Sequence, residues 1–143
     1  MLLAYDRNPF YRAHVAWAAG DLDVFLSNLD DDIVYIVNVD GITAPYASSA
    51  VGKEDVRFRF QFLLDTFRVD IFEIESFEEG PEFDHSVVRG SYLHKQTGER
   101  LDVKFRFRGW TQNGLLVRLE EQHDAAYVIA FERFVRYLGN EAG

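Results

Sequence analysis

Residues 100–123, RLDVKFRFRGWTQNGLLVRLEEQH, predict two antiparallel strands joined by a tight turn. Successive side chains of a strand point to opposite faces. In the first strand, Arg100–Thr111, we expect an apolar set to face the core and a basic set to face outward: Val103, Phe105 and Phe107 against Lys104, Arg106 and Arg108. Asn113-Gly114 favours a hairpin because both residues tolerate a positive φ.

The second strand of this hairpin, Leu115–His123, continues the alternation into polar residues. Val117 and Leu119 are the apolar residues that match the inner face of the neighbouring strand. The same alternation turns two polar residues inward, Glu121 and His123. The outward set is then Arg118, Glu120 and Gln122. The sequence therefore predicts a carboxyl and an imidazole on an apolar face.

Two more strands are predicted before this hairpin, Arg68–Phe77 and Asp84–Lys95, so that four successive strands form an antiparallel meander. Turn residues at 79–81 and 96–98 separate them. One face of the strand 84–95 comprises Val88, Gly90, Tyr92 and His94. A glycine inside a strand suggests a bend or a bulge at residue 90.

The first 30 residues predict two helices. Asn8 and Pro9 suit the start of a helix over Phe10–Ala19, whose inner face holds Phe10, His14, Trp17 and Ala18. Asp21 is predicted to cap a short second helix through Leu29, which the acidic run 30–32 ends.

The next segment predicts a strand, Ile33–Val39, and an amphipathic helix, Lys53–Phe67. Either Tyr35 and Val37 or the residues beside them face the core, since both faces of this strand are mostly apolar. Asp124 favours a last helix, Ala125–Leu138, that stops at Gly139. Its predicted buried stripe is Tyr127, Phe131, Phe134, Val135 and Leu138.

Composition restricts the classes of function. The 143 residues suit a single α+β domain, 1–143. The net charge of -9 disfavours binding to nucleic acid or to an anionic membrane. Because the chain has no cysteine, it can form no disulfide. The apolar start is too short for a secretion signal and no apolar run approaches about 20 residues, so we expect no membrane span and a cytoplasmic location. The four histidines lack the spacing of a zinc site, and no cofactor is expected.

Three groups of short motifs resemble the nuclear-transport-factor-2-like superfamily, and within it the SnoaL-like polyketide cyclases. They are Ala19-Gly20-Asp21-Leu22-Asp23 with 31–35, Pro45-Tyr46-Ala47 with 52–56, and Asn113-Gly114 with 120–126. The resemblance covers most of the chain. It implies a cone-shaped fold in which a bent antiparallel sheet packs on N-terminal helices, here with an additional C-terminal helix. It also implies a deep apolar cavity and a homodimer.

The resemblance does not extend to the two best-understood enzymes of this fold. The acid/base residues that ketosteroid isomerases use fall at Ala13, Val37 and Phe105 or Phe107 in this chain. The arginine and aspartate of limonene-epoxide-hydrolase-like enzymes fall at Val88 and Gly90, while their last acid corresponds to Glu121. SnoaL-like cyclases place a carboxylate near the end of the last strand, where Glu121 and Asp124 both fit.

Three residues are candidates for catalysis: Glu121, His123 and Asp124. An inward Glu121 would be poorly hydrated, and loss of hydration favours the protonated form of a carboxyl, which suits proton exchange near neutral pH. The alternatives are an outward Glu121 or an ion pair. His123 could be its proton partner or an ordinary strand-end residue, and Asp124 could simply cap the last helix.

The expected cavity would bind a small apolar ligand, with a lining of Trp17, Tyr35, Val37, Tyr46, Val88, Tyr92, Phe105, Phe107 and Leu119. Aromatic residues at these spacings can equally be plain core. Two functions follow. One is an acid/base enzyme of cyclase, isomerase or hydrolase type that acts on an apolar cyclic carbonyl compound. The other is a ligand-binding or dimeric association module without catalysis.

Overall fold

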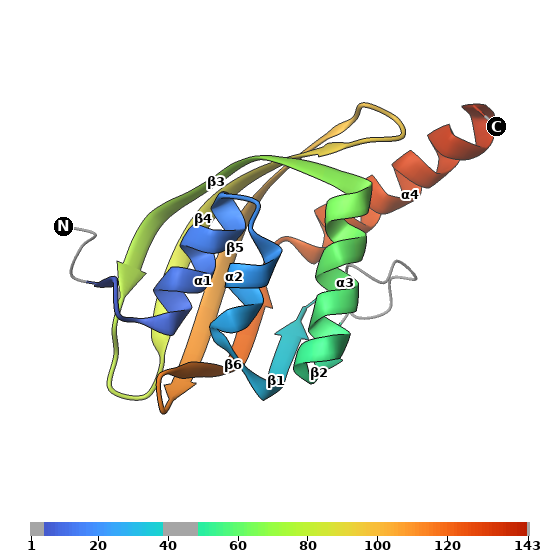
Figure 1. Cartoon of the computed structure of the whole chain (residues 1–143). Coiled ribbons are helices and arrows are strands. Elements are labelled where there is room, and N and C mark those ends of the chain that lie inside the picture. Colours follow the sequence, from blue (N-terminus) through green and yellow to red (C-terminus); the bar gives the residue numbers. More distant parts are fainter. Residues whose placement is uncertain (1–4, 39–48, 143) are drawn as a thin grey trace.

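The computed structural model describes residues 5–38 and 49–142. Its elements are α1 (Pro9–Ala18), α2 (Leu22–Ser27), β1 (Leu29–Val37), β2 (Ala50–Val51), α3 (Lys53–Thr66), β3 (Phe67–Glu78), β4 (Asp84–His94), β5 (Arg100–Gln112), β6 (Leu115–Gln122) and α4 (Ala125–Ala142). The six strands form one sheet in the order β2-β1-β6-β5-β4-β3. α1, α2 and α3 lie over its concave face (Figure 1). The predicted α+β class is confirmed.

The sheet is mixed, whereas the sequence predicted only antiparallel pairing. β3 to β6 form the expected meander, and Asn113 and Gly114 have positive φ values of 54° and 79° in the turn between β5 and β6. β1 instead runs parallel to β6, with Tyr35 opposite Leu119 and Val37 opposite Glu121. The β5–β6 hairpin leaves one edge of β6 unpaired, and β1 supplies its hydrogen-bond partners there.

The helix starts were predicted correctly, and some ends were not. The Asn8 side chain accepts hydrogen bonds from the amides of Phe10 and Tyr11, and that of Asp21 accepts one from Val24. However, Leu29 and the acidic run 30–32 already belong to β1, since sheet pairing begins where Leu116 N–H donates to the Asn28 carbonyl. Ala18, expected on the inner face of α1, is exposed.

The alternation of β5 is confirmed, but β6 contains an irregularity. Val103, Phe105 and Phe107 are buried, while Lys104, Arg106 and Arg108 are exposed. Trp110 pairs with Arg118 but Thr111 pairs with Leu116, which leaves Val117 as the extra residue of a bulge. Leu116 is therefore the buried residue in place of the predicted Val117, which is only half-buried.

Gly90 pairs regularly with Phe72 of β3 and with Val103 of β5. The register shifts between β3 and β4 lie in β3, after Val69 and after Ile74. Of the predicted bend or bulge at Gly90, the bulge is therefore ruled out. A methyl group at residue 90 would come within 2.7 Å of Cε2 of Phe105, so the glycine makes room for that ring.

α4 extends beyond its predicted end, through Gly139, and leads away from the sheet (Figure 1). Its buried residues are Val128, Phe131 and Val135, and Phe131 contacts the rings of Phe67 and His94. Tyr127 and Phe134 are exposed, contrary to the predicted stripe, because only one narrow row of α4 packs against the rest of the protein. No helix in the described part of the chain is long and apolar enough to span a membrane.

Truncating Phe131 should destabilise the protein, whereas truncating Phe134 should not. Phe131 is 9% exposed and Phe134 on the same helix is 47% exposed. Phe131→Ala removes a buried ring and is expected to lower the free energy of unfolding by about 3 kcal/mol. Phe134→Ala is the matched control, with an expected effect below about 0.5 kcal/mol. Urea unfolding measures both, and equal effects would refute the docking of α4.

Candidate functional site

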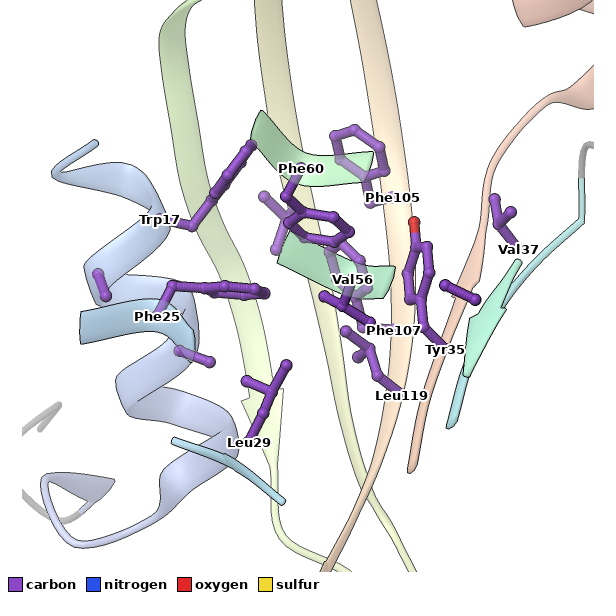
Figure 2. Close-up of a cluster of buried hydrophobic side chains, with 14 of the residues drawn as sticks. Trp17, Phe25, Leu29, Tyr35, Val37, Val56, Phe60, Phe105, Phe107 and Leu119 are labelled. Carbon is purple, nitrogen blue, oxygen red and sulfur yellow. The ribbon is translucent and has the colours of Figure 1, made fainter. Parts of the chain in front are cut away.

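The sheet and the three N-terminal helices enclose a mostly apolar cavity. The volume of this cavity is about 60 Å³, which is several times the volume that one water molecule needs. Figure 2 shows aromatic rings from α1, α2, α3 and β5 gathered on one side of Tyr35. The lining comprises Phe10, Ala13, His14, Trp17, Phe25, Tyr35, Phe60, Leu63, Phe72, Tyr92, Phe105, Phe107, Leu116, Leu119 and Glu121.

Among the described residues, Glu121 is the one acidic residue in this lining. It lies in β6 between Val37 of β1 and Phe107 of β5, and its side chain is 14% exposed. The Tyr35 hydroxyl donates a hydrogen bond of 2.9 Å to Oε1 of Glu121. Burial and the negative charge of Glu121 raise the pKa of Tyr35 well above its usual value. Tyr35 therefore keeps its proton and acts as a donor.

A second hydroxyl enters the cavity from β4. The Trp17 indole N–H donates to the Tyr92 oxygen over 2.9 Å, and burial raises the pKa of Tyr92 as well. None of the described residues accepts the hydroxyl hydrogen of Tyr92 in return. Tyr92 thus has a hydrogen to offer to a ligand oxygen.

His14 is a polar wall residue that sequence reasoning placed on the inner face of the helix but did not assign to the site. Its Nδ1 lies 2.7 Å from the Phe10 carbonyl, and its Nε2 lies 2.7 Å from Oγ of Ser86. A carbonyl can only accept, so Nδ1 carries the hydrogen and Nε2 accepts from Ser86. Burial lowers the pKa of His14 to about 4, which keeps the ring neutral.

The predicted ligand-binding residues divide into three groups. Trp17, Tyr35, Tyr92, Phe105, Phe107 and Leu119 line the cavity. Val37 and Val88 are buried in the core outside this lining, and Val37 lies beyond Tyr35, away from the aromatic rings (Figure 2). Tyr46 lies outside the described residues. Phe25 and Phe60 also line the cavity. Helical spacing alone could not identify them as wall residues rather than core.

The other two catalytic candidates lie apart from this cavity. His123 borders an adjoining hollow, where its Nε2 is 3.3 Å from Oε2 of Glu121. Asp124 caps α4, since its Oδ1 accepts from the Tyr127 amide over 3.1 Å. Among the described residues, no group of three or more His, Asp or Glu side chains could hold a metal ion.

Comparison with known proteins identifies the fold. The sequence matches no protein-family model and, at a significant level, no curated protein. A solved nuclear-transport-factor-2-like protein of unknown function from Burkholderia pseudomallei superposes with a TM-score of 0.75 over 85% of this chain and 92% of its own, at 18% identity. The chain has the nuclear-transport-factor-2-like fold.

Two other solved structures share the nuclear-transport-factor-2-like fold of this chain. TerC, crystallised with polyporic acid, superposes with a TM-score of 0.73 over 90% of this chain and 95% of its own, at 12% identity. A protein from Mesorhizobium loti, provisionally described as a SnoaL-like polyketide cyclase, gives 0.64 over 76% and 91%, at 18% identity. The structural similarity establishes the fold, but at identities this low it does not establish the activity.

The buried His14 should make the protein less stable in acid. Its pKa is 6.5 when unfolded and about 4 when folded, so the unfolded state binds more protons between these values. The contribution of His14 to the free energy of unfolding is fully present above pH 6.5. It falls by about 3 kcal/mol as the pH drops toward 4.

Urea unfolding at several pH values tests this, with His14→Gln expected to lose less stability than the wild type between pH 6.5 and 4. His85→Gln, on the outer face of β4, is the control and should keep the wild-type slope. An unchanged slope in His14→Gln would contradict the assignment of a neutral, buried ring.

Proposed function

We propose that the chain is an acid/base enzyme of SnoaL-like type that binds a small, largely apolar cyclic carbonyl compound and uses Glu121 to move a proton on it. The observation that carries this proposal is the Glu121 carboxylate, which lines an otherwise mostly apolar cavity and is held by the Tyr35 hydroxyl. A carboxylate that borders a cavity and is held in one orientation can accept a proton from a compound bound beside it.

The cavity residues divide the chemistry between them. The apolar ring of the ligand packs against Phe60, Phe107 and Leu119. The Tyr92 O–H donates to the carbonyl oxygen, and the hydrogen bond from Trp17 strengthens it as a donor. Glu121 takes a proton from the carbon next to the carbonyl, and negative charge moves to the oxygen beside Tyr92. In a compound with a β,γ double bond, Glu121 then returns the proton to the γ-carbon, and the double bond moves into conjugation with the carbonyl.

The orientation of the Glu121 carboxylate is set from two sides. Tyr35 holds Oε1, and His123 Nε2 lies 3.3 Å from Oε2. Fixing the base in this way lowers the reorganisation needed for proton transfer. Asp124 caps α4 and has no part in the proposed chemistry.

The alternative is a binding module without turnover. Both oxygens of Glu121 already have partners, an arrangement that would also serve to hold a polar group of a ligand. The two functions differ in whether the bound compound exchanges its protons.

Glu121→Gln should abolish proton exchange while the ligand still binds. The probe is 2-tetralone, a bicyclic ketone, and ¹H NMR in D₂O follows the loss of its α-protons. Removing the general base should slow the exchange above background at least about 100-fold. Glu120→Gln, one residue away on the outer face, is the matched control and should exchange like the wild type. Binding without exchange by the wild type would favour the module.

We also propose that the chain forms a homodimer through the outer face of the sheet. That face pairs opposite charges, with Arg118 to Glu120 at 2.8 Å and Lys104 to Glu75 at 3.1 Å. Arg106 lies in a depression with His85, Arg108, Glu120 and Gln122. A surface of mixed charge suits a two-fold contact, in which each patch meets its own copy.

Sedimentation at micromolar concentration should give a species of twice the 16.6 kDa chain mass. Arg106→Glu places an acid beside Glu120 and should shift the population to the monomer, because like charges then meet across the two-fold axis. Arg57→Glu, on α3, is the control and should remain dimeric. A wild-type protein that sediments only as a monomer would overturn the dimer.

A further inference from the structure

A depression on the outer face of the sheet contains two arginines that have no acidic partner. Its volume is about 170 Å³. Three neighbouring strands form its lining, which comprises His85 of β4, Arg106 and Arg108 of β5, and Glu120 and Gln122 of β6. The buried neighbours of the two arginines face the helices, so the depression and the cavity lie on opposite faces of the sheet.

The strand register places these five side chains side by side. Arg108 lies opposite His85 on one side and opposite Glu120 on the other. Arg106 lies opposite Gln122. Neighbouring strands are about 4.8 Å apart, and alternate residues of one strand are about 7 Å apart. One small molecule can therefore contact side chains from all three strands.

The other basic side chains along this part of the outer face are ion-paired at 3.0–3.4 Å: Arg89 with Glu73, Lys104 with Glu75, and Arg100 with Asp70. In contrast, none of the carboxylates in the described part of the chain forms an ion pair with Arg106 or Arg108. The chain has 24 acidic residues against 15 lysines and arginines, so a shortage of acids does not explain these two unpaired charges.

The acid in the depression does not neutralise the two arginines. Oε2 of Glu120 accepts two hydrogen bonds from Arg118, at 2.8 and 3.0 Å, although Arg108 is the residue opposite Glu120 in the register. The Arg108 guanidinium lies instead over the ring of Phe83, 5.3 Å from its centroid. Stacking of this kind leaves the N–H groups in the guanidinium plane free to donate. Because Glu120 and Arg118 cancel, Arg106 and Arg108 leave two positive charges at the depression.

From this arrangement we infer that the depression binds a small molecule through a dianionic phosphate group. The guanidinium groups of Arg106 and Arg108 match its two negative charges, and each can donate two parallel hydrogen bonds to phosphate oxygens. The Gln122 amide and the His85 imidazole add further N–H donors. The inference does not rest on the proposed acid/base chemistry, since that chemistry belongs to the cavity on the other face of the sheet.

A phosphate group fits this set of donors better than a carboxylate does. A carboxylate presents two oxygens along one edge, and a single arginine satisfies both of them. A phosphate group carries close to two negative charges near neutral pH and presents three acceptor oxygens in different directions. Donors from three strands approach it from different sides. The volume of about 170 Å³ is many times what one water needs, so the phosphate can carry a small organic substituent.

The proposed homodimer would bring the depressions of two copies to the same contact. The unpaired guanidinium groups of both chains would then repel one another, and a bound dianion would offset this repulsion. The anion site itself needs only one chain, because all five lining residues belong to that chain.

A titration of the wild type with inorganic phosphate at about pH 7.5, with ionic strength held constant by sodium chloride, tests the site. We expect the guanidinium ¹³Cζ NMR signals of Arg106 and Arg108 to shift together, with a dissociation constant of about 1 mM. Both side chains are exposed, so their replacement leaves the fold intact. Arg106→Gln and Arg108→Gln should each raise the dissociation constant about tenfold. Arg89→Gln, at an exposed and ion-paired position of β4, is the matched control and should bind like the wild type.

Three results would overturn the inference. They are a wild type that shows no saturable shift, an equal shift with acetate at the same ionic strength, and an unchanged dissociation constant in both variants. Sedimentation of the same samples reports the homodimer separately. A wild type that binds phosphate as a monomer supports the anion site and contradicts the dimer, whereas a dimer without phosphate binding contradicts the anion site alone.

Discussion

The site depends on a single interruption of side-chain alternation in β6. Leu116 and Leu119 are three residues apart and Leu116 and Glu121 are five apart, so a regular strand would put Leu116 on the opposite face from both. The bulge at Val117 absorbs one residue and brings all three onto the inner face. Leu116 can then close the base of the cavity while Glu121 stays in its wall. Deleting the extra residue would turn one or the other to the outside.

Most polar groups that the cavity buries are paired with one another. Trp17 donates to Tyr92, Tyr35 donates to Glu121, and His14 is held between Phe10 and Ser86. Such pairing offsets the cost of removing these groups from water and fixes their orientation. Among the described residues of the lining, the hydroxyl hydrogen of Tyr92 remains without an acceptor. The proposed chemistry uses it to bind the carbonyl oxygen of the ligand.

Local features of the sequence predicted the parts of the fold that local physics decides. Asn8 and Asp21 cap their helices, Asn113-Gly114 forms the turn, and the alternation of β5 sets its buried face. The family resemblance predicted the fold class. The inward position of Glu121 was also predicted. That prediction used Val117 and Leu119 to assign the inner face of the strand, and the bulge excludes Val117 from that face.

Features that depend on distant partners could not be predicted from the sequence. The parallel pairing of β1 depends on the free edge of β6, and the buried row of α4 depends on where Phe67 and His94 lie. The partnership of His14 with Ser86 joins residues 72 positions apart. The bulge at Val117 has no glycine or proline to mark it. Each of these arises from tertiary packing, which a periodic pattern does not encode.

A crystal structure of the protein with 2-tetralone would test the proposed role of Glu121 most directly. We expect the ketone inside the cavity, with its carbonyl oxygen within hydrogen-bonding distance of the Tyr92 hydroxyl and its α-carbon facing the Glu121 carboxylate. A ketone bound only at the surface, or a Glu121 side chain that points into bulk solvent beside a cavity filled by its own side chains, would contradict it.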